Sequence, residues 1–134
     1  MTQQKQDAAA LAAKIRTYLK DLERGNVADV CSLFKADARI YSPFLGWVQP
    51  APFFEKVVAA SGQSVITPLD ICASVDGHPR VAAYFVYDWA LKDGATVKFE
   101  CVDIFEFGGD GLIEKMIIVY DTYPIRATVG DKYA

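Results

Sequence analysis

The sequence has few of the features that define nucleic-acid-binding, membrane and secreted proteins. Its 134 residues carry 14 basic and 17 acidic side chains, for a net charge of −3, without the basic stripe that a phosphate backbone requires. The longest apolar runs, such as residues 81–86, are far shorter than the ~20 residues of a membrane-spanning helix. Residues 1–7 are polar and lack the apolar core of a signal peptide. We therefore expect a cytoplasmic protein without nucleic-acid or membrane partners.

Cysteine and histidine are also scarce. Cys31, Cys72 and Cys101 are widely spaced in apolar sequence, which predicts buried free thiols rather than a disulfide framework or a zinc cluster. The single histidine, His78, falls in a turn. The glycines of residues 108–111 join two strands instead of opening a helix, so they do not form a phosphate-binding loop. Neither a metal nor a cofactor is expected.

The first half of the chain predicts three helices with a short strand between them. Apolar residues recur at every third or fourth position, as in an amphipathic helix, and Gly25 and Asn26 supply a helix stop and an N-cap. In chain order the predicted elements are a helix over 7–24, a helix over 26–36, a strand over 37–41, an apolar loop over 44–47 and a helix over 53–60.

The second half predicts four long strands separated by glycine-containing turns: 64–75, 81–91, 96–107 and 112–123. Helices followed by an antiparallel meander indicate an α+β fold, in which the helices cover one face of a curved sheet. We predict one domain over residues 1–134, with its core at about 8–123 and a tail over 124–134. A cone-shaped sheet covered by helices encloses an interior where a small molecule can bind.

An aspartate lies on the apolar face of the third long strand. Side chains of a strand alternate between its two faces, and Asp103 shares a face with Phe99, Cys101, Phe105 and Phe107. Burial raises the pKa of a carboxyl group, and a neutral carboxylic acid can donate a hydrogen bond. Asp103 is therefore either a functional proton donor or a buried acid that a tyrosine satisfies for structural reasons.

The last strand has an outer face marked by Lys115. This phase places Met116, Ile118 and Tyr120 inside, and it leaves Asp121 outside. A β-bulge between Ile118 and Asp121 would reverse the assignment.

For the second long strand, the residues alone leave both orientations open. Phe85, Tyr87 and Trp89 form an apolar face, and Tyr84 and Asp88 lie on the opposite face. Burial preference alone would send the aromatic residues inward and leave Asp88 in water.

Several features together resemble a known superfamily. After a helix-helix-strand opening come Pro43 and Phe44, and later the segment Cys-Val-Asp-Ile-Phe-Glu-Phe over 101–107 and Asp-Gly-Leu-Ile over 110–113. They resemble the nuclear transport factor 2-like superfamily, within it the branch of ketosteroid isomerase and the SnoaL-like polyketide cyclases. The resemblance extends over most of residues 10–123 and implies the cystatin-like roll, a curved mixed or antiparallel sheet wrapped by three helices.

The resemblance also implies roles for single residues. Ketosteroid isomerase holds its oxyanion with a tyrosine and a protonated aspartate and uses a second aspartate as general base. Tyr18, on the first helix, corresponds to the tyrosine, and Asp103 corresponds to the oxyanion aspartate. The base position, directly before Pro43, is Ser42. A serine hydroxyl cannot take a carbon-bound proton at neutral pH without help, which argues against steroid isomerisation by that route.

On the second long strand the resemblance implies that Tyr84, Val86 and Asp88 face the pocket. Asp88 then stands about where limonene-epoxide-hydrolase-like members carry an acid. The arginine and second aspartate of those relatives correspond to Val86 and Ile118, so their triad is incomplete.

The same orientation would leave an aromatic patch on the outer face of the sheet. Its members would be Phe85, Tyr87 and Trp89, joined by Ile117 and Val119. A patch of this size is larger than monomers usually expose, which predicts a homodimer through the outer sheet face.

We therefore expect a cofactor-independent enzyme of the isomerase, cyclase or hydrolase type, acting on a small apolar carbonyl, lactone or epoxide compound. Asp103 and Tyr18 would stabilise developing oxyanion charge, and Asp88 would move the proton or activate water. The alternative interpretation of Tyr18 is a core tyrosine without a role in catalysis. The alternative function is a non-catalytic binding or dimeric interaction module. The predicted pocket lining comprises Phe44, Trp47, Phe53, Phe54, Tyr84, Met116, Ile118 and Tyr120.

Overall fold

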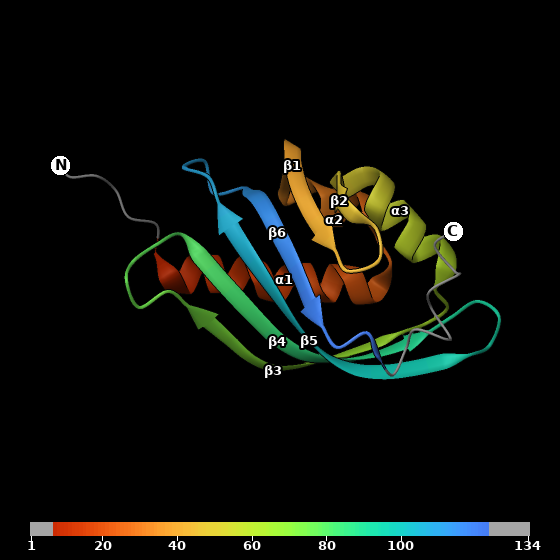
Figure 1. Cartoon of the computed structure of the whole chain (residues 1–134). Helices are drawn as coiled ribbons and strands as arrows, with labels where there is room; N and C mark the ends of the chain where they lie inside the picture. The colour runs from red at the N-terminus through yellow and green to blue at the C-terminus, as the bar shows by residue number, and fades with distance from the viewer. Residues whose placement is uncertain (1–6, 124–134) are drawn as a thin grey trace.

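The structure is a computed structural model, and it describes residues 7–123; the tail predicted over 124–134 lies outside the described residues. The elements, drawn in Figure 1, are α1 (Ala8–Arg24), α2 (Val27–Ser32), β1 (Phe34–Ser42), β2 (Gly46–Val48), α3 (Pro50–Ala60), β3 (Val65–Ala73), β4 (Arg80–Ala90), β5 (Thr96–Phe107) and β6 (Ile113–Tyr120).

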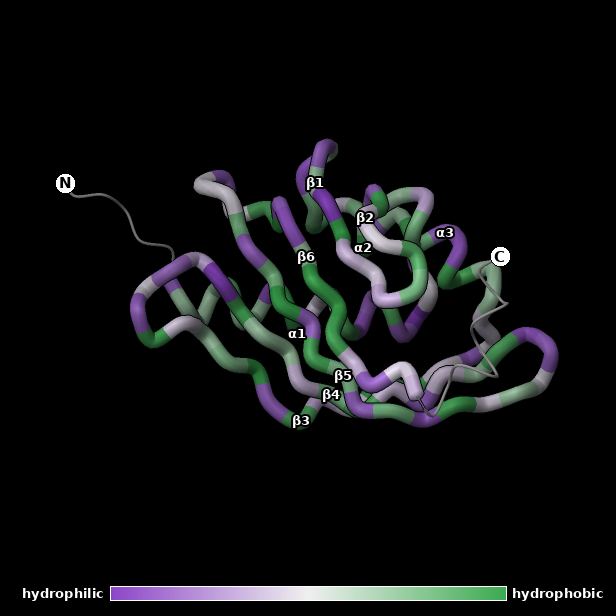
Figure 2. Tube along the Cα trace, in the orientation of Figure 1, coloured by the Kyte–Doolittle hydropathy of each residue, from purple (hydrophilic) through white to green (hydrophobic). Residues whose placement is uncertain are grey.

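Six strands form a single curled sheet in the order β2-β1-β6-β5-β4-β3. Neighbouring strands are antiparallel, except that β1 and β6 are parallel. Figure 1 shows α1 crossing one face of the sheet, with α2 and α3 beside β1 and β2. Figure 2 shows hydrophobic residues concentrated in the middle of β5 and β6 and hydrophilic residues at the β4–β5 turn. The predicted α+β fold, with three helices and a curved mixed sheet, is confirmed.

No helix within residues 7–123 has the length and apolar character needed to cross a lipid bilayer.

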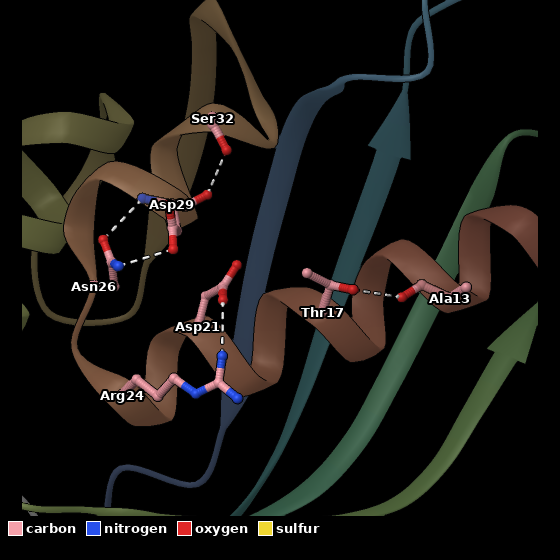
Figure 3. Close-up of polar contacts among 7 residues, drawn as sticks. All are labelled: Ala13, Thr17, Asp21, Arg24, Asn26, Asp29 and Ser32. Atoms are coloured by element: carbon pink, nitrogen blue, oxygen red, sulfur yellow. Dashed lines mark hydrogen bonds and ion pairs between the residues drawn. The ribbon is translucent and has the colours of Figure 1, made fainter.

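Local signals in the sequence define the end of α1 and the start of α2. Asp7 caps α1 by accepting a hydrogen bond from the Ala9 N–H at 3.1 Å. Gly25 ends the helix with a φ of 72°, a left-handed conformation that costs glycine little. Asn26 caps α2, since its side-chain oxygen accepts a hydrogen bond from the Asp29 N–H at 3.1 Å (Figure 3). These two caps confirm the predicted junction.

The predicted extension of the second helix to residue 36 is wrong. Phe34 already belongs to β1 and pairs with Ile113 of β6, and the Ile113 N–H donates to the Leu33 carbonyl at 2.9 Å. Phe34 remains buried, so the same apolar residue fits either a helix or a strand. Pairing with a strand from the far end of the chain decides between them.

The strands β5 and β6 have the orientation that their charged residues predict. Cys101 and Asp103 of β5 are buried, while Lys98 is exposed. On β6, Met116 is fully buried and Val119 is half exposed. Charged residues therefore sort the two faces correctly where a strand carries them.

The orientation that the resemblance implied for β4 is wrong. Directly opposed residues of an antiparallel pair point to the same face, and Phe85 of β4 lies opposite the buried Cys101 of β5. Phe85 is 1% exposed, and Trp89 is buried as well. Asp88 lies opposite Lys98 on the outer face. The burial preference of the aromatic residues is the correct guide for this strand.

The observed orientation of β4 also changes the aromatic patch that was expected on the outer face of the sheet. Phe85, Tyr87 and Trp89 line an interior pocket, so they do not belong to an exposed surface. Ile117 and Val119 remain on the outer face. A homodimer through this face stays a prediction, which the sedimentation coefficient of the purified protein checks.

The cysteines are less buried than predicted. Cys101 is buried, but Cys31 is half buried and Cys72 is exposed, and all three are free thiols. Cys72 of β3 lies opposite Ala82 of β4, and Ala82 lies opposite Ile104 of β5, so Cys72 points to the outer face of the sheet. Apolar neighbours in sequence do not show which face of a strand a residue occupies.

Candidate functional site

An acid lies in the interior, on the face of β5 that α1 covers. Asp103 is 3% exposed and lies two residues from Cys101, so both side chains point to the same side of the strand. The Cys101 Sγ–H donates a hydrogen bond to Asp103 Oδ1 at 3.1 Å. Among residues 7–123 this thiol is the hydrogen-bond partner of Asp103, which leaves the second carboxyl oxygen, Oδ2, for the pocket.

Burial controls the protonation of this acid. Removal from water raises the pKa of Asp103 to about 7, although the hydrogen bond from Cys101 lowers it. Burial and the neighbouring Asp103 also raise the pKa of the Cys101 thiol, so the sulfur stays protonated and serves as a donor. Near neutral pH, Asp103 can therefore both give and take a proton.

Replacing Cys101 by alanine is expected to raise the pKa of Asp103 above its wild-type value. The thiol donor favours the charged carboxylate, and alanine has no donor to replace it. Carbon-13 NMR of the side-chain carboxyl, followed as a function of pH, measures the change. A Cys101→Ser variant keeps a donor and should keep the lower pKa; an unchanged or lowered pKa in Cys101→Ala would contradict this role.

Tyr18 of α1 faces the same space from the opposite layer. Its ring packs edge-on against Phe105, with centroids 5.0 Å apart. Burial raises the pKa of the Tyr18 hydroxyl well above its ordinary value, and the nearby Asp103 and Cys101 raise it further. Tyr18 is therefore a neutral donor at any physiological pH. Within the described chain no hydrogen bond joins Tyr18 to Asp103. The hydrogen-bonding capacity of each group is therefore not used by the other.

Ser42, at the end of β1, adds another hydroxyl group to the pocket, whose lining also includes Tyr87 and Tyr120. Its Oγ accepts hydrogen bonds from the N–H groups of Phe44 and Leu45, both at 3.3 Å. Both lone pairs of the hydroxyl oxygen are occupied by these bonds, so the remaining capacity is donation of the hydroxyl proton. Ser42 supplies a donor where the resemblance expects a base.

An aromatic and aliphatic wall encloses these groups. Phe99 packs against Tyr120 with centroids 4.7 Å apart, and Tyr87 lies 5.6 Å from Phe99. The inner pocket has a volume of about 50 Å³, which is room for only a few water molecules. The lining comprises Tyr18, Leu22, Ser42, Phe53, Phe54, Val57, Phe85, Tyr87, Trp89, Phe99, Cys101, Asp103, Ile118 and Tyr120.

The structure brings some of the predicted site residues together. Asp103 and Tyr18 line the inner pocket, as do four predicted wall residues: Phe53, Phe54, Ile118 and Tyr120. The predicted catalytic residue Asp88 does not, because it points to the outer face.

Four predicted wall residues also lie elsewhere. The Tyr84 hydroxyl donates to the Glu100 carboxylate at 2.6 Å on the exposed side of the sheet. Met116 is part of the packed core, and Phe44 contacts Tyr120 from outside the lining. Trp47 lines a different, outer groove.

Sequence reasoning missed the β4 contribution to the pocket. Phe85, Tyr87 and Trp89 supply one wall, and the Trp89 Nε1–H is satisfied by Ser61 Oγ at 2.6 Å. The signal was present, since aromatic residues occupy every second position of this strand and prefer burial.

The donor set of the pocket does not resemble a metal site. Across residues 7–123, no three histidine, cysteine, aspartate or glutamate side chains gather closely enough to hold a metal ion.

Comparison with known proteins identifies relatives of this chain. A family model described as the SnoaL-like domain matches residues 15–116. No functionally curated protein is significantly similar to the chain in sequence.

Three solved structures share the fold. SalBIII, described as an epoxide hydrolase/cyclase-like enzyme in pyran ring formation of the polyether salinomycin, is 22% identical, with a TM-score of 0.75 over 87% of this chain and 94% of its own. AclR from Streptomyces galilaeus, a hydroxylase candidate, is 18% identical, with a TM-score of 0.76 over 92% and 83%. A protein of unknown function with a cystatin-like fold, from Methylobium petroleophilum, is 18% identical, with a TM-score of 0.74 over 87% and 79%.

Proposed function

The chain belongs to the SnoaL-like domain family of the nuclear transport factor 2-like superfamily, and from this premise we propose that it performs acid–base chemistry without a cofactor on a small, mainly apolar molecule. The reacting group is an oxygen of a carbonyl, lactone or epoxide. Only this group needs to enter the inner pocket, whose volume of about 50 Å³ is too small for the rest of the ligand.

The observation that carries the proposal is a buried carboxyl group with a pKa of about 7 beside a second donor. The pKa of Asp103 lies in the range where a general acid works best at neutral pH. Tyr18 lines the same pocket and stays protonated. Two neutral donors in a buried, mainly apolar pocket stabilise negative charge on an oxygen far better than water does.

In the proposed reaction on an epoxide, neutral Asp103 donates its proton to the epoxide oxygen as the carbon–oxygen bond breaks. A water molecule or a hydroxyl of the ligand itself forms the new carbon–oxygen bond. Its proton returns to the Asp103 carboxylate, directly or through water, and this regenerates the acid. Protons and electrons balance without an oxidant or reductant, and the outcome is hydrolysis or ring formation. SalBIII, described with ring-forming chemistry, shares the fold at 22% identity.

Reactions that need a separate base fit the pocket less well. Asp88 points to the outer face, and Ser42 can only donate. Within residues 7–123, Asp103 is the one aspartate or glutamate in the pocket lining, so in the proposed reaction it acts as acid and base in turn.

The missing second carboxylate also favours one alternative, a module that binds an apolar ligand without turnover. Native mass spectrometry of the purified protein detects a co-purified small molecule. A ligand that stays chemically unchanged on long incubation would favour binding, and its conversion would favour catalysis.

The direct test uses Tyr18→Phe. With a panel of small apolar epoxides, lactones and enones followed by gas chromatography, we expect this variant to lower turnover about 100-fold, as loss of one oxyanion donor does. Tyr41→Phe is the matched control, because Tyr41 is exposed on β1 and should leave turnover unchanged. A folded Tyr18→Phe variant with wild-type turnover would rule out the proposed role of this hydroxyl.

A further inference from the structure

A second cavity lies between β2 and the first turns of α3. Its volume is about 510 Å³, ten times that of the inner pocket and within the range of small-molecule sites. We call it the outer groove. Its polar lining is Arg39, Gln49 and Lys56, and its apolar floor includes Trp47, Val48 and Phe53.

The charge of the outer groove is opposite to that of the protein. The chain has a net charge of −3, yet the described residues that line the groove include two cationic side chains and no acidic one. Arg39 and Lys56 form no ion pair with a carboxylate in the part of the chain that the structure describes. Two unneutralised cations beside apolar surface are complementary to an organic anion.

Trp47 is held in place by its neighbours. The residue is 49% exposed, and its ring packs edge-on against Tyr41 with centroids 5.2 Å apart. The Arg39 guanidinium carbon lies 4.5 Å from the centre of the indole ring. This stacking leaves the N–H edges of the guanidinium available for an acid group. The indole and the guanidinium thus form one continuous surface with an apolar and a cationic part.

We propose that the outer groove is a binding site for an organic acid with a flat apolar body, which lies on Trp47 while its acid group lies between Arg39 and Lys56. The proposal rests on the residues of the groove and does not depend on the chemistry of the inner pocket. Phe53 lines both cavities, so its side chain separates a ligand in the groove from the inner pocket.

The two tryptophans of the chain make the site testable by NMR. Trp47 lines the outer groove and Trp89 lines the inner pocket, so their indole N–H signals report the two cavities separately. The probes are 2-naphthoate, which is anionic at neutral pH, and 2-naphthalenemethanol, which has the same rings without the charge. We expect naphthoate to shift the Trp47 signal and to bind about tenfold more tightly than the alcohol, the difference that two exposed ion pairs supply.

The double variant Arg39→Gln/Lys56→Gln should abolish this tenfold preference. Both side chains are exposed, so folding is not at risk. The control, Lys92→Gln/Lys98→Gln, removes the same charge from exposed positions on the β4–β5 hairpin and should retain the preference. Equal affinity for the two probes, or a shift confined to Trp89, would overturn the proposal. A Trp47 signal that moves with protein concentration alone would also overturn it, since a second copy would then cover the groove.

Discussion

Replacing Asp103 by asparagine is expected to lower turnover by about 10²–10³-fold while the protein stays folded. Asparagine has nearly the same shape and keeps an oxygen that can accept the Cys101 hydrogen bond, which is 3.1 Å long in the wild type. It cannot release a proton, so the acid step of the proposed reaction is lost. This is the largest effect on activity that we expect from any single substitution.

The same variant should change the dependence of stability on pH. An aspartate in the unfolded chain has a pKa of about 3.9, and burial raises the pKa of Asp103 to about 7 in the folded state. Between these values the folded protein holds a proton that the unfolded chain has released. The free energy of unfolding therefore decreases as pH rises from about 4 to about 7, by a few kcal/mol in total. Asp103→Asn should lack this decrease and be more stable than the wild type at pH 8.

Urea unfolding from pH 4 to pH 8 measures this difference, and the turnover assay gives its functional counterpart. Wild-type activity should fall above about pH 7, because the proton donor is then lost. Asp88→Asn is the matched control, since Asp88 lies opposite Lys98 on the outer face and should leave both profiles unchanged. An Asp103→Asn variant with wild-type turnover, or with a wild-type pH slope of stability, would show that Asp103 is not the buried acid described above.

Replacing Phe85 by alanine is expected to have the largest effect on stability. Phe85 is almost completely buried and packs in the wall of the inner pocket. Removing a buried phenylalanine costs about 3–5 kcal/mol. Tyr84, the next residue along β4, lies on the other face and its hydroxyl bonds an exposed glutamate. Tyr84→Ala should therefore cost no more than about 1 kcal/mol.

Chemical denaturation followed by circular dichroism compares the two variants directly. The ratio of the two losses tests the orientation of β4, because a strand turned by one residue would exchange the two positions. A larger loss for Tyr84→Ala than for Phe85→Ala would contradict the observed pairing of Phe85 with Cys101.

Much of the fold follows from local sequence. Gly25 and Asn26 end one helix and begin the next, because a left-handed residue and a side-chain cap act within a few residues of themselves. On β5, alternating charged and apolar residues predict that Asp103 is buried. For the same reason, the burial of the candidate acid Asp103 and of its neighbour Cys101 can be predicted from the sequence alone.

Other features depend on contacts between distant segments. The helical pattern continues through Phe34, but pairing with Ile113 makes that residue part of a strand. The same kind of contact decides the orientation of β4, where the burial preference of the aromatic residues and the orientation implied by the resemblance point in opposite directions. The register against β5, with Phe85 opposite Cys101, excludes Asp88 from the pocket.

By itself, then, the sequence determined the α+β fold, the buried position of Asp103 and the presence of Tyr18 on the apolar stripe of α1. These properties depend on periodicity and caps, which are local. The tertiary structure alone decided that Asp103 is the one carboxyl group that the described residues place in the pocket, that Ser42 can only donate there, and that Arg39 and Trp47 share an outer groove. Each of these depends on which segments meet across the sheet, and long-range pairing is not encoded in any short stretch of the chain.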